Sequence, residues 1–186
     1  MARTDDNWIQ TYSGLRYHPT DPHSDDVRMV DIAHHLSNIC RFTGATRKFY
    51  SVAQHCVIMS RMPMICEAGL AWLALLHDAA EAYTGDFARP VKRSCEEMQA
   101  MDTANTLAVL KHFGMDDQFP FPPEIDLADR IMLATERRDL LENSPSPWKL
   151  IDREKVQPLP DGIFPMLPEQ AKEAFCNRVR ELRIGR

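Results

Sequence analysis

The residues most able to do chemistry are an adjacent pair, His77 and Asp78, with Glu81 following, all within the most apolar stretch of the chain. Burying several ionisable side chains in an apolar helix is costly unless something pairs with them. If residues 66–83 form one helix, His77 and Glu81 are four positions apart and share a face, and Asp78 lies close to that face. Imidazole and carboxylate groups together favour a divalent metal ion as the partner. The stretch therefore predicts a metal-dependent hydrolase rather than a generic helical domain.

Two further residues can complete a ligand set with His77 and Asp78. His55 precedes the apolar stretch on a separate predicted helix, and Asp129 follows on a later one. Metal sites in helical bundles are built in this way, from inward side chains on facing helices. Two imidazoles and two carboxylates suit Co, Mn, Zn, Fe or Ni, with Mg as a further alternative, and leave open positions for water and substrate.

The remaining histidines are interpreted as structural. His34 and His35 are adjacent in a predicted helix whose apolar residues face inward, and a histidine in that setting is more often hydrogen-bonded in the core than bound to a metal. His18, His23 and His112 fall in predicted loops or at a helix end. We include none of these residues in the site.

The elements that must position the site are almost all helical, since apolar spacing predicts the helices while proline and glycine mark the breaks. The predicted helices span residues of about 30–42, 52–62, 66–83, 91–113, 124–142 and 168–182. Residues 8–12 can form a short strand, and the proline-rich stretch 144–168 is expected to be a long surface loop. The sequence thus predicts one all-α domain over residues 1–186, with its metal site in the core and minor or no strand near the N-terminus.

Composition narrows the classes of partner. Apolar residues make up 44% and charged residues 26%, which is ordinary for a globular domain. The net charge of −5 argues against a nucleic-acid polymer, because phosphate contacts along a polymer need clustered Lys and Arg. We find no signal peptide, no apolar run of membrane-spanning length and no CxxC spacing among the five cysteines. We therefore expect a cytoplasmic protein without a membrane partner.

The pattern His55 … His77-Asp78 … Asp129 resembles the HD superfamily of metal-dependent phosphohydrolases, which take their name from the His-Asp pair. The likeness continues past these four residues. Bacterial deoxynucleoside 5′-monophosphatases of this superfamily carry an HD-x-x-E-x-x-x-G-D run followed by a P-x-P-V-K-like segment, and residues 77–92 read HDAAEAYTGDFARPVK here. The resemblance implies an HD-type helical bundle in which the four residues bind the metal.

These phosphatases also carry an Arg–aromatic pair before the first histidine, and Arg41-Phe42 stands at that position. The family usually has Trp where this chain has Phe42, which is a departure at a position implied to stack on the base or sugar. The likeness covers residues of about 30–142, the core of the domain.

Roles in catalysis follow from the resemblance and from metal chemistry. Glu81 is placed to orient or deprotonate a water on the metal. Asp86 is implied to assist the leaving sugar oxygen or to hold the sugar hydroxyl. Arg41 and Lys92 are implied to bind phosphate, and Arg89 can reach a further phosphate of a longer chain.

Residues 8–14 and 40–55 are also similar to small HD proteins of bacteriophages, one branch of which hydrolyses dATP. The resemblance implies cleavage between the deoxyribose 5′-oxygen and the α-phosphate, with a dATP or general dNTP triphosphohydrolase as the first expectation. A deoxynucleoside 5′-monophosphatase is the alternative, and a non-catalytic nucleotide-binding HD protein is the second. The substrate is in each case a small nucleotide. Because relatives form dimers or larger closed assemblies, a homo-oligomer is expected.

Overall fold

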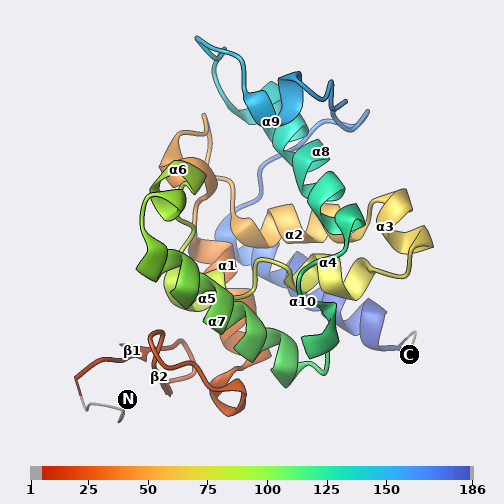
Figure 1. The fold of residues 1–186 in the computed structure, drawn as a ribbon. Helices are drawn as coiled ribbons and strands as arrows, with labels where there is room; N and C mark the ends of the chain where they lie inside the picture. The colour runs from red at the N-terminus through yellow and green to blue at the C-terminus, as the bar shows by residue number, and fades with distance from the viewer. Residues whose placement is uncertain (1–5, 185–186) are drawn as a thin grey trace.

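A computed structural model describes residues 6–184, in which regular structure is helical except for one small hairpin (Figure 1). The α-helices are α1 (Met29–Asn38), α2 (Val52–Ser60), α3 (Pro63–Glu67), α4 (Ala71–Leu76), α5 (Glu81–Thr84), α6 (Arg89–Arg93), α7 (Glu96–His112), α8 (Pro123–Leu140), α9 (Lys149–Asp152) and α10 (Pro168–Ile184). Three 3₁₀ turns are also described: Ser24–Asp26, Arg41–Gly44 and Asp116–Gln118. The all-α prediction with a minor N-terminal strand is confirmed.

The hairpin pairs strand β1 (Ile9–Gln10) with strand β2 (Arg16–Tyr17) in antiparallel register. It lies at the opposite end of the molecule from α9 in Figure 1. Ser13, in its turn, donates hydrogen bonds from its backbone N and its Oγ to the carboxylate of Asp31 on α1, at 2.6 and 2.8 Å. The hairpin is thereby fixed to the helical core.

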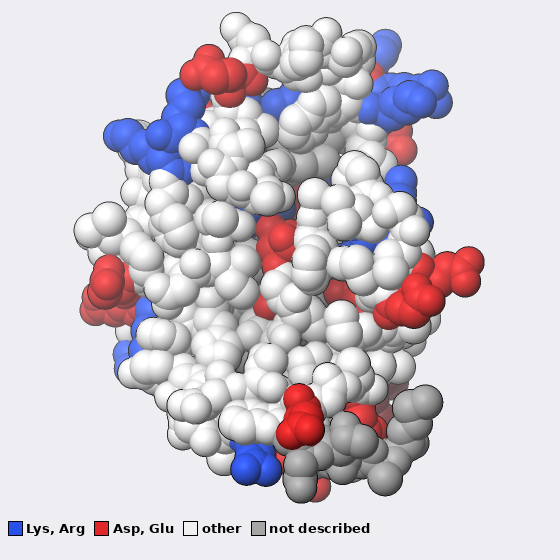
Figure 2. Space-filling model, turned by 90° about the vertical axis from the view of Figure 1, so that its left-hand side faces the viewer, with Lys and Arg blue, Asp and Glu red and all other residues white. Residues whose placement is uncertain are grey.

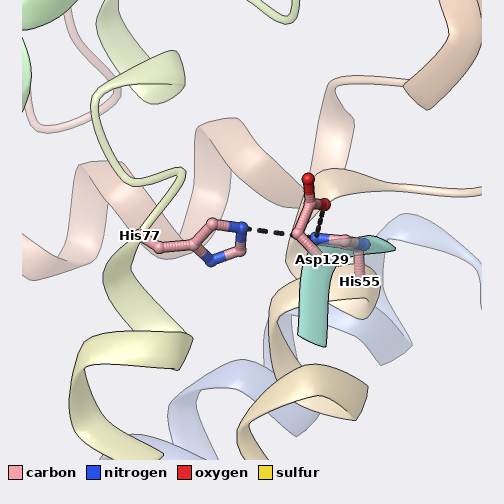
Figure 3. Close-up of side chains that lie close together, drawn as sticks. All are labelled: His55, His77 and Asp129. Carbon is pink, nitrogen blue, oxygen red and sulfur yellow. Dashed lines mark hydrogen bonds and ion pairs between the residues drawn. The ribbon is translucent and has the colours of Figure 1, made fainter. Parts of the chain in front are cut away.

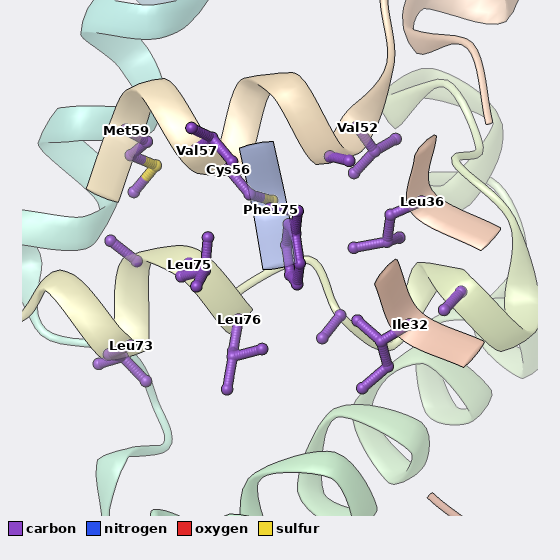
Figure 4. Close-up of a cluster of buried hydrophobic side chains, with 14 of the residues drawn as sticks. Ile32, Leu36, Val52, Cys56, Val57, Met59, Leu73, Leu75, Leu76 and Phe175 are labelled. Atoms are coloured by element: carbon purple, nitrogen blue, oxygen red, sulfur yellow. The ribbon is translucent and has the colours of Figure 1, made fainter. Parts of the chain in front are cut away.

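The core forms where α10 packs against α1, α2 and α4. These helices contribute aliphatic side chains that are closed to solvent, and Figure 4 shows Phe175 of α10 among them. The neighbours labelled in that view include Leu36 of α1, Cys56 of α2 and Leu76 of α4. This apolar layer holds α2 and α4 side by side. His55 lies on α2, and His77 directly follows the end of α4.

The single helix predicted over residues 66–83 is wrong. Gly69 has a φ of 71°, in the left-handed region that favours glycine, and ends α3 before α4 begins. After Leu76 the chain leaves the α-helix for a series of tight turns, in which Ala79 N donates to Leu76 O at 3.0 Å and Glu81 N donates to Asp78 O at 3.0 Å. The His-Asp pair therefore follows the end of α4 instead of lying inside a helix.

Two other boundaries differ from prediction. The helix predicted over 91–113 is broken at Cys95, whose φ of −134° and ψ of 110° are extended, so that α6 and α7 are separate. The first helix ends at Asn38, because Ile39 becomes extended and Cys40 bridges to Ser51. The proline-rich stretch 144–168 is mostly loop as predicted, but it contains the short helix α9. None of the helices described between residues 6 and 184 has the length and apolar character needed to cross a bilayer.

Candidate metal centre

Three elements bring a group of possible metal ligands together in the core. His55 comes from α2, His77 from the turn after α4 and Asp129 from α8, and Figure 3 shows the three side chains converging. The Nε2 atoms of His55 and His77 are 3.4 Å apart, and Oδ1 of Asp129 is 3.6 Å from Nε2 of His55. One ligand atom from each lies within 4.8 Å of the others, so this group can hold a metal ion.

Asp78 lies against the same group. Its Oδ1 is 3.2 Å from Nε2 of His77, and its Oδ2 is 3.7 Å from Nε2 of His55. Burial raises the pKa of Asp78, but the neighbouring His77 and other positive charges lower it further, and the net effect is a pKa below the usual value. Asp78 is thus an ionised carboxylate beside the two imidazoles.

The hydrogen bonds behind the two imidazoles determine which ring nitrogen faces the centre. Nδ1 of His77 lies 2.8 Å from the carbonyl oxygen of Ala74, which can only accept, so this nitrogen carries the proton. Nδ1 of His55 lies 2.7 Å from Oε1 of Glu136, which is fully buried. In neutral imidazoles with these tautomers, both Nε2 atoms present lone pairs to each other and to the carboxylates. Such a set of donor atoms fits a cation placed between the two Nε2 atoms and the carboxylates.

A proton can compete with the metal for His77. Burial lowers the pKa of this imidazole, but the adjacent Asp78 carboxylate raises it more, so that the net pKa is well above the usual value. Metal ligands must be deprotonated, and binding of an ion at Nε2 therefore releases this proton.

Glu136 is a site residue that sequence reasoning missed. It lies two helical turns after Asp129 on α8, and its carboxylate accepts from both Nδ1 of His55 and Nη2 of Arg41, the latter at 3.2 Å. Burial raises the pKa of Glu136, but Arg41 and His55 lower it further, and the carboxylate stays ionised. The sequence held one signal for this role, because Glu136 is a carboxylate on the buried face of the helix that also carries Asp129.

Arg41 is held at the edge of the metal group by an unusual turn. Its Nη1 is 3.4 Å from Oδ2 of Asp78, and its buried Nε has no hydrogen-bond partner within residues 6–184. The next two residues, Phe42 and Thr43, have φ values of 56° and 53°, in the left-handed region. Such conformations cost about 1–3 kcal/mol each and persist where the surroundings enforce them, commonly at functional sites.

Glu81 and Asp86 line a cavity of about 840 Å³ that reaches Asp78, Asp129 and Arg41. Glu81 is buried, and its Oε2 has no partner among the described residues. Burial, together with the charges of Asp78 and Asp86, raises the pKa of Glu81 well above the usual value. Burial is also the main cause that raises the pKa of Asp86. Both carboxyl groups therefore hold their protons more strongly than ordinary carboxyl groups do.

Lys92 and Arg89, predicted to bind phosphate, line the same cavity but contact carboxylates in this structure. Lys92 Nζ is 2.9 Å from Oδ1 of Asp102. Arg89 Nη2 is 3.2 Å from Oδ2 of Asp129. Both side chains therefore line the cavity, and each forms an ion pair with a carboxylate of the protein.

The lining of the cavity is partly apolar. Phe42, Phe87, Leu133 and Trp148 form part of it, and the ring centroids of Phe42 and Trp148 are 6.2 Å apart. Figure 2, which views the side of α6 and α7, shows acidic side chains recessed in a hollow whose borders are mostly uncharged. Sequence reasoning missed Trp148 because it lies in the stretch read only as a loop.

The histidines predicted to be structural have partners away from this group. His35 Nδ1 lies 2.6 Å from the carbonyl of Ala82, and its Nε2 accepts from the backbone N of Tyr12 at 3.0 Å. His34 stacks on the Tyr12 ring with centroids 3.7 Å apart. These rings fasten the N-terminal segment to α1.

Comparison with known proteins places the chain among bacterial relatives. No protein-family model matches it. It is 35% identical over 176 residues to YfdR, an uncharacterized protein of Escherichia coli, and the match covers 95% of this chain and 96% of that protein. It is 32% identical over 142 residues to an uncharacterized protein of Rhodobacter capsulatus, covering 72% of each. At this identity over nearly the full length of both proteins, the chain belongs to the family of Escherichia coli YfdR.

Proposed function

We propose that this protein is a metal-dependent nucleotide phosphohydrolase of the HD type, cleaving between the deoxyribose 5′-oxygen and the α-phosphate. The observation that carries the proposal is the pair of imidazoles whose Nε2 atoms face each other at 3.4 Å beside carboxylates. Next to them, a buried Glu81 has an unpartnered oxygen within the wall of a large cavity. A group able to hold a cation, a candidate base and space for a ligand are thus adjacent.

The ligands proposed for the ion are His55, His77, Asp78 and Asp129. When bound, a divalent ion lowers the pKa of water and polarises a phosphoryl oxygen. Its identity among Co, Mn, Zn, Fe, Ni and Mg is open in this proposal.

The chain's own residues supply the remaining steps. Glu81 accepts a proton from the attacking water through its unpartnered oxygen, and burial, which raises the pKa of this carboxyl, makes its ionised form a stronger base. The Arg41 guanidinium binds the α-phosphate, because a planar cation with several donors pairs with phosphate oxygens. Asp86, with its raised pKa, is suited to protonate the departing 5′-oxygen or to bind the sugar hydroxyl.

The length of the phosphate chain separates two versions of the proposal. A dATP or general dNTP triphosphohydrolase is favoured by the cavity of about 840 Å³ with Arg89 and Lys92 at its wall. A deoxynucleoside 5′-monophosphatase is favoured by a different observation, that Arg89 and Lys92 already pair with Asp129 and Asp102. A non-catalytic nucleotide-binding protein is the third version, and the placement of Glu81 and Asp86 beside the metal group speaks against it.

The test is hydrolysis by the purified protein loaded separately with Co, Mn, Zn or Mg, given each of the four dNTPs and dNMPs. Ion-exchange chromatography then resolves the products. Nucleoside with intact triphosphate establishes the triphosphohydrolase, whereas orthophosphate released only from monophosphates establishes the 5′-nucleotidase. Absence of turnover with every metal and nucleotide would reject the hydrolase and leave the nucleotide-binding version.

A further inference from the structure

Trp148 lines the cavity, and several contacts hold it in place. Its indole Nε1 donates to Oγ of Ser144 at 3.0 Å, and its backbone N donates to Oδ2 of Asp152. Arg137 on α8 donates to both carboxylate oxygens of Asp152 at 2.8 Å, and its guanidinium lies over the Trp148 ring, 5.6 Å from the centroid. Three contacts thus hold Trp148: one at the indole edge, one at its backbone N and one from Arg137 over the face of the ring.

The ring belongs to a cavity whose lining is partly charged and partly apolar. Arg41, Asp78 and Asp129 are among the charged lining residues, and Phe42, Leu133 and Trp148 are among the apolar ones. The Phe42 and Trp148 rings are tilted by 43° with centroids 6.2 Å apart. A ligand in this cavity can place an anionic group near Arg41 and a flat apolar group against the Phe42 and Trp148 rings.

We propose that Trp148 is a specificity-determining residue that stacks on the nucleobase of the substrate, with Phe42 beside it. This inference rests on the proposed nucleotide phosphohydrolase and adds the residue that recognises the base end. The indole N–H is already occupied by Ser144, so the ring offers its π-face and edge without a free hydrogen-bond donor. Stacking of this kind tolerates every base, because every base has a π-face. Purines have a larger ring system and stack more strongly, so they are expected to bind better than pyrimidines by a modest factor, without strict selection of adenine.

The first test compares two substrates that share the phosphate but differ in the base. Trp148→Ala is expected to lower kcat/KM for the best deoxynucleotide by roughly ten-fold, the effect typical of losing one base–aromatic stack. Hydrolysis of the base-free sugar with the same phosphate chain, 2-deoxyribose 5-phosphate or 2-deoxyribose 5-triphosphate, is expected to stay unchanged. Trp148→Phe retains an aromatic ring and is expected to retain most of the activity on the nucleotide. An equal fall on both substrates, or no fall on the nucleotide, would overturn the assignment.

The second test does not depend on catalysis. Titration of the metal-free protein with deoxyadenosine is expected to quench tryptophan fluorescence. The quench should disappear in Trp148→Phe and persist in the matched control Trp8→Phe, in which the substituted ring lies at the N-terminal hairpin. A quench of equal size in Trp148→Phe, or no quench in the wild type, would contradict the inference.

The two tests separate this inference from the proposed function. A Trp148-dependent quench in a protein that hydrolyses no nucleotide would support the base site and reject the hydrolase. Hydrolysis of nucleotides with an unchanged preference in Trp148→Ala would support the hydrolase and reject the base site.

Discussion

Nδ1 of His55 lies 2.7 Å from Oε1 of Glu136, and the other oxygen of this carboxylate accepts from Arg41 at 3.2 Å. One buried carboxylate thus orients a candidate metal ligand and a candidate phosphate ligand together. Carboxylates in this position set the tautomer of the histidine and raise its basicity.

Glu136→Gln is therefore expected to weaken metal binding by about ten- to a hundred-fold, because the amide keeps the size of the side chain but loses its charge. Isothermal titration with Co or Mn measures the change. Glu124→Gln, at the exposed start of the same helix, is the matched control and should bind metal as the wild type does. Unchanged affinity in Glu136→Gln would show that His55 does not depend on this carboxylate.

Metal addition is expected to stabilise the folded protein, since an ion that binds only the native state shifts the unfolding equilibrium. At a free metal concentration of about a hundred times Kd the gain is about 2.7 kcal/mol, which corresponds to a rise in Tm of roughly 5–10 °C for a chain of this size. Thermal unfolding with and without Mn or Co measures the rise. It should vanish in His77→Ala and persist in His23→Ala, where the substituted side chain is on the surface. A rise of the same size in both variants would place the ion elsewhere.

Replacement of Glu81 by Gln is expected to lower kcat by roughly a hundred- to ten-thousand-fold, because the unpartnered oxygen can no longer accept a proton. Metal affinity, measured by titration on the same preparation, should change little. Steady-state hydrolysis of the best nucleotide provides the readout. Full activity with bound metal would remove Glu81 from the catalytic role.

Phe175 is fully buried where α10 meets α1, α2 and α4. Phe175→Ala is expected to reduce the free energy of unfolding by about 3–5 kcal/mol, through lost burial and the cavity that remains. Urea denaturation measures the difference. The control Val30→Ala removes a side chain that is 46% exposed on α1 and should change stability by no more than about 0.5 kcal/mol. Similar losses in the two variants would argue against the packing of α10 described above.

Asp139 provides a pH-dependent prediction away from the metal group. Its carboxylate accepts from Arg138 Nε at 2.6 Å and from the backbone N of Ile163 at 2.9 Å, and chiefly the hydrogen bond from Arg138 lowers its pKa. A folded-state pKa below the unfolded value means that the contribution to stability is complete above the unfolded pKa of about 3.9 and disappears as pH falls through the folded value.

Asp139→Asn should consequently be less stable than the wild type at pH 7, and the difference should shrink as the pH falls below about 4. Urea unfolding at pH 7, 5 and 3 measures both curves. The exposed Asp117→Asn serves as the control. A difference that stayed constant over this range would show that the charge of Asp139 contributes nothing.

Local signals explain why some elements were predictable from the sequence. Ser51 caps α2 by accepting from Gln54 N at 3.2 Å, and Pro123 occupies the first turn of α8, so both helices begin where such residues predict. His55 and Asp129 lie on these two helices. Their convergence was expected from the way metal sites are built in helical bundles and from the resemblance to HD proteins.

Other features depend on tertiary contacts that no local pattern records. Residues 77–80 include two alanines, which favour helix, yet the chain turns there and points His77 toward His55. Trp148 lies far from the His-Asp pair in the sequence and reaches the cavity only through the path of residues 144–152. Packing between distant segments decides both cases, and it outweighs helix propensity.

The contact between Arg89 and Asp129 would couple the two binding events proposed above, of a cation and of an anion. Arg89 Nη2 lies 3.2 Å from one oxygen of the same carboxylate whose other oxygen faces the His55 Nε2 atom at 3.6 Å. An anionic ligand that attracts Arg89 leaves more negative charge on Asp129, which increases the attraction for a cation. Linkage requires the reverse effect to be equal, so that a bound cation releases Arg89 toward an anion by the same factor. Cation and anion would then fill the cavity cooperatively, and each would be held weakly without the other.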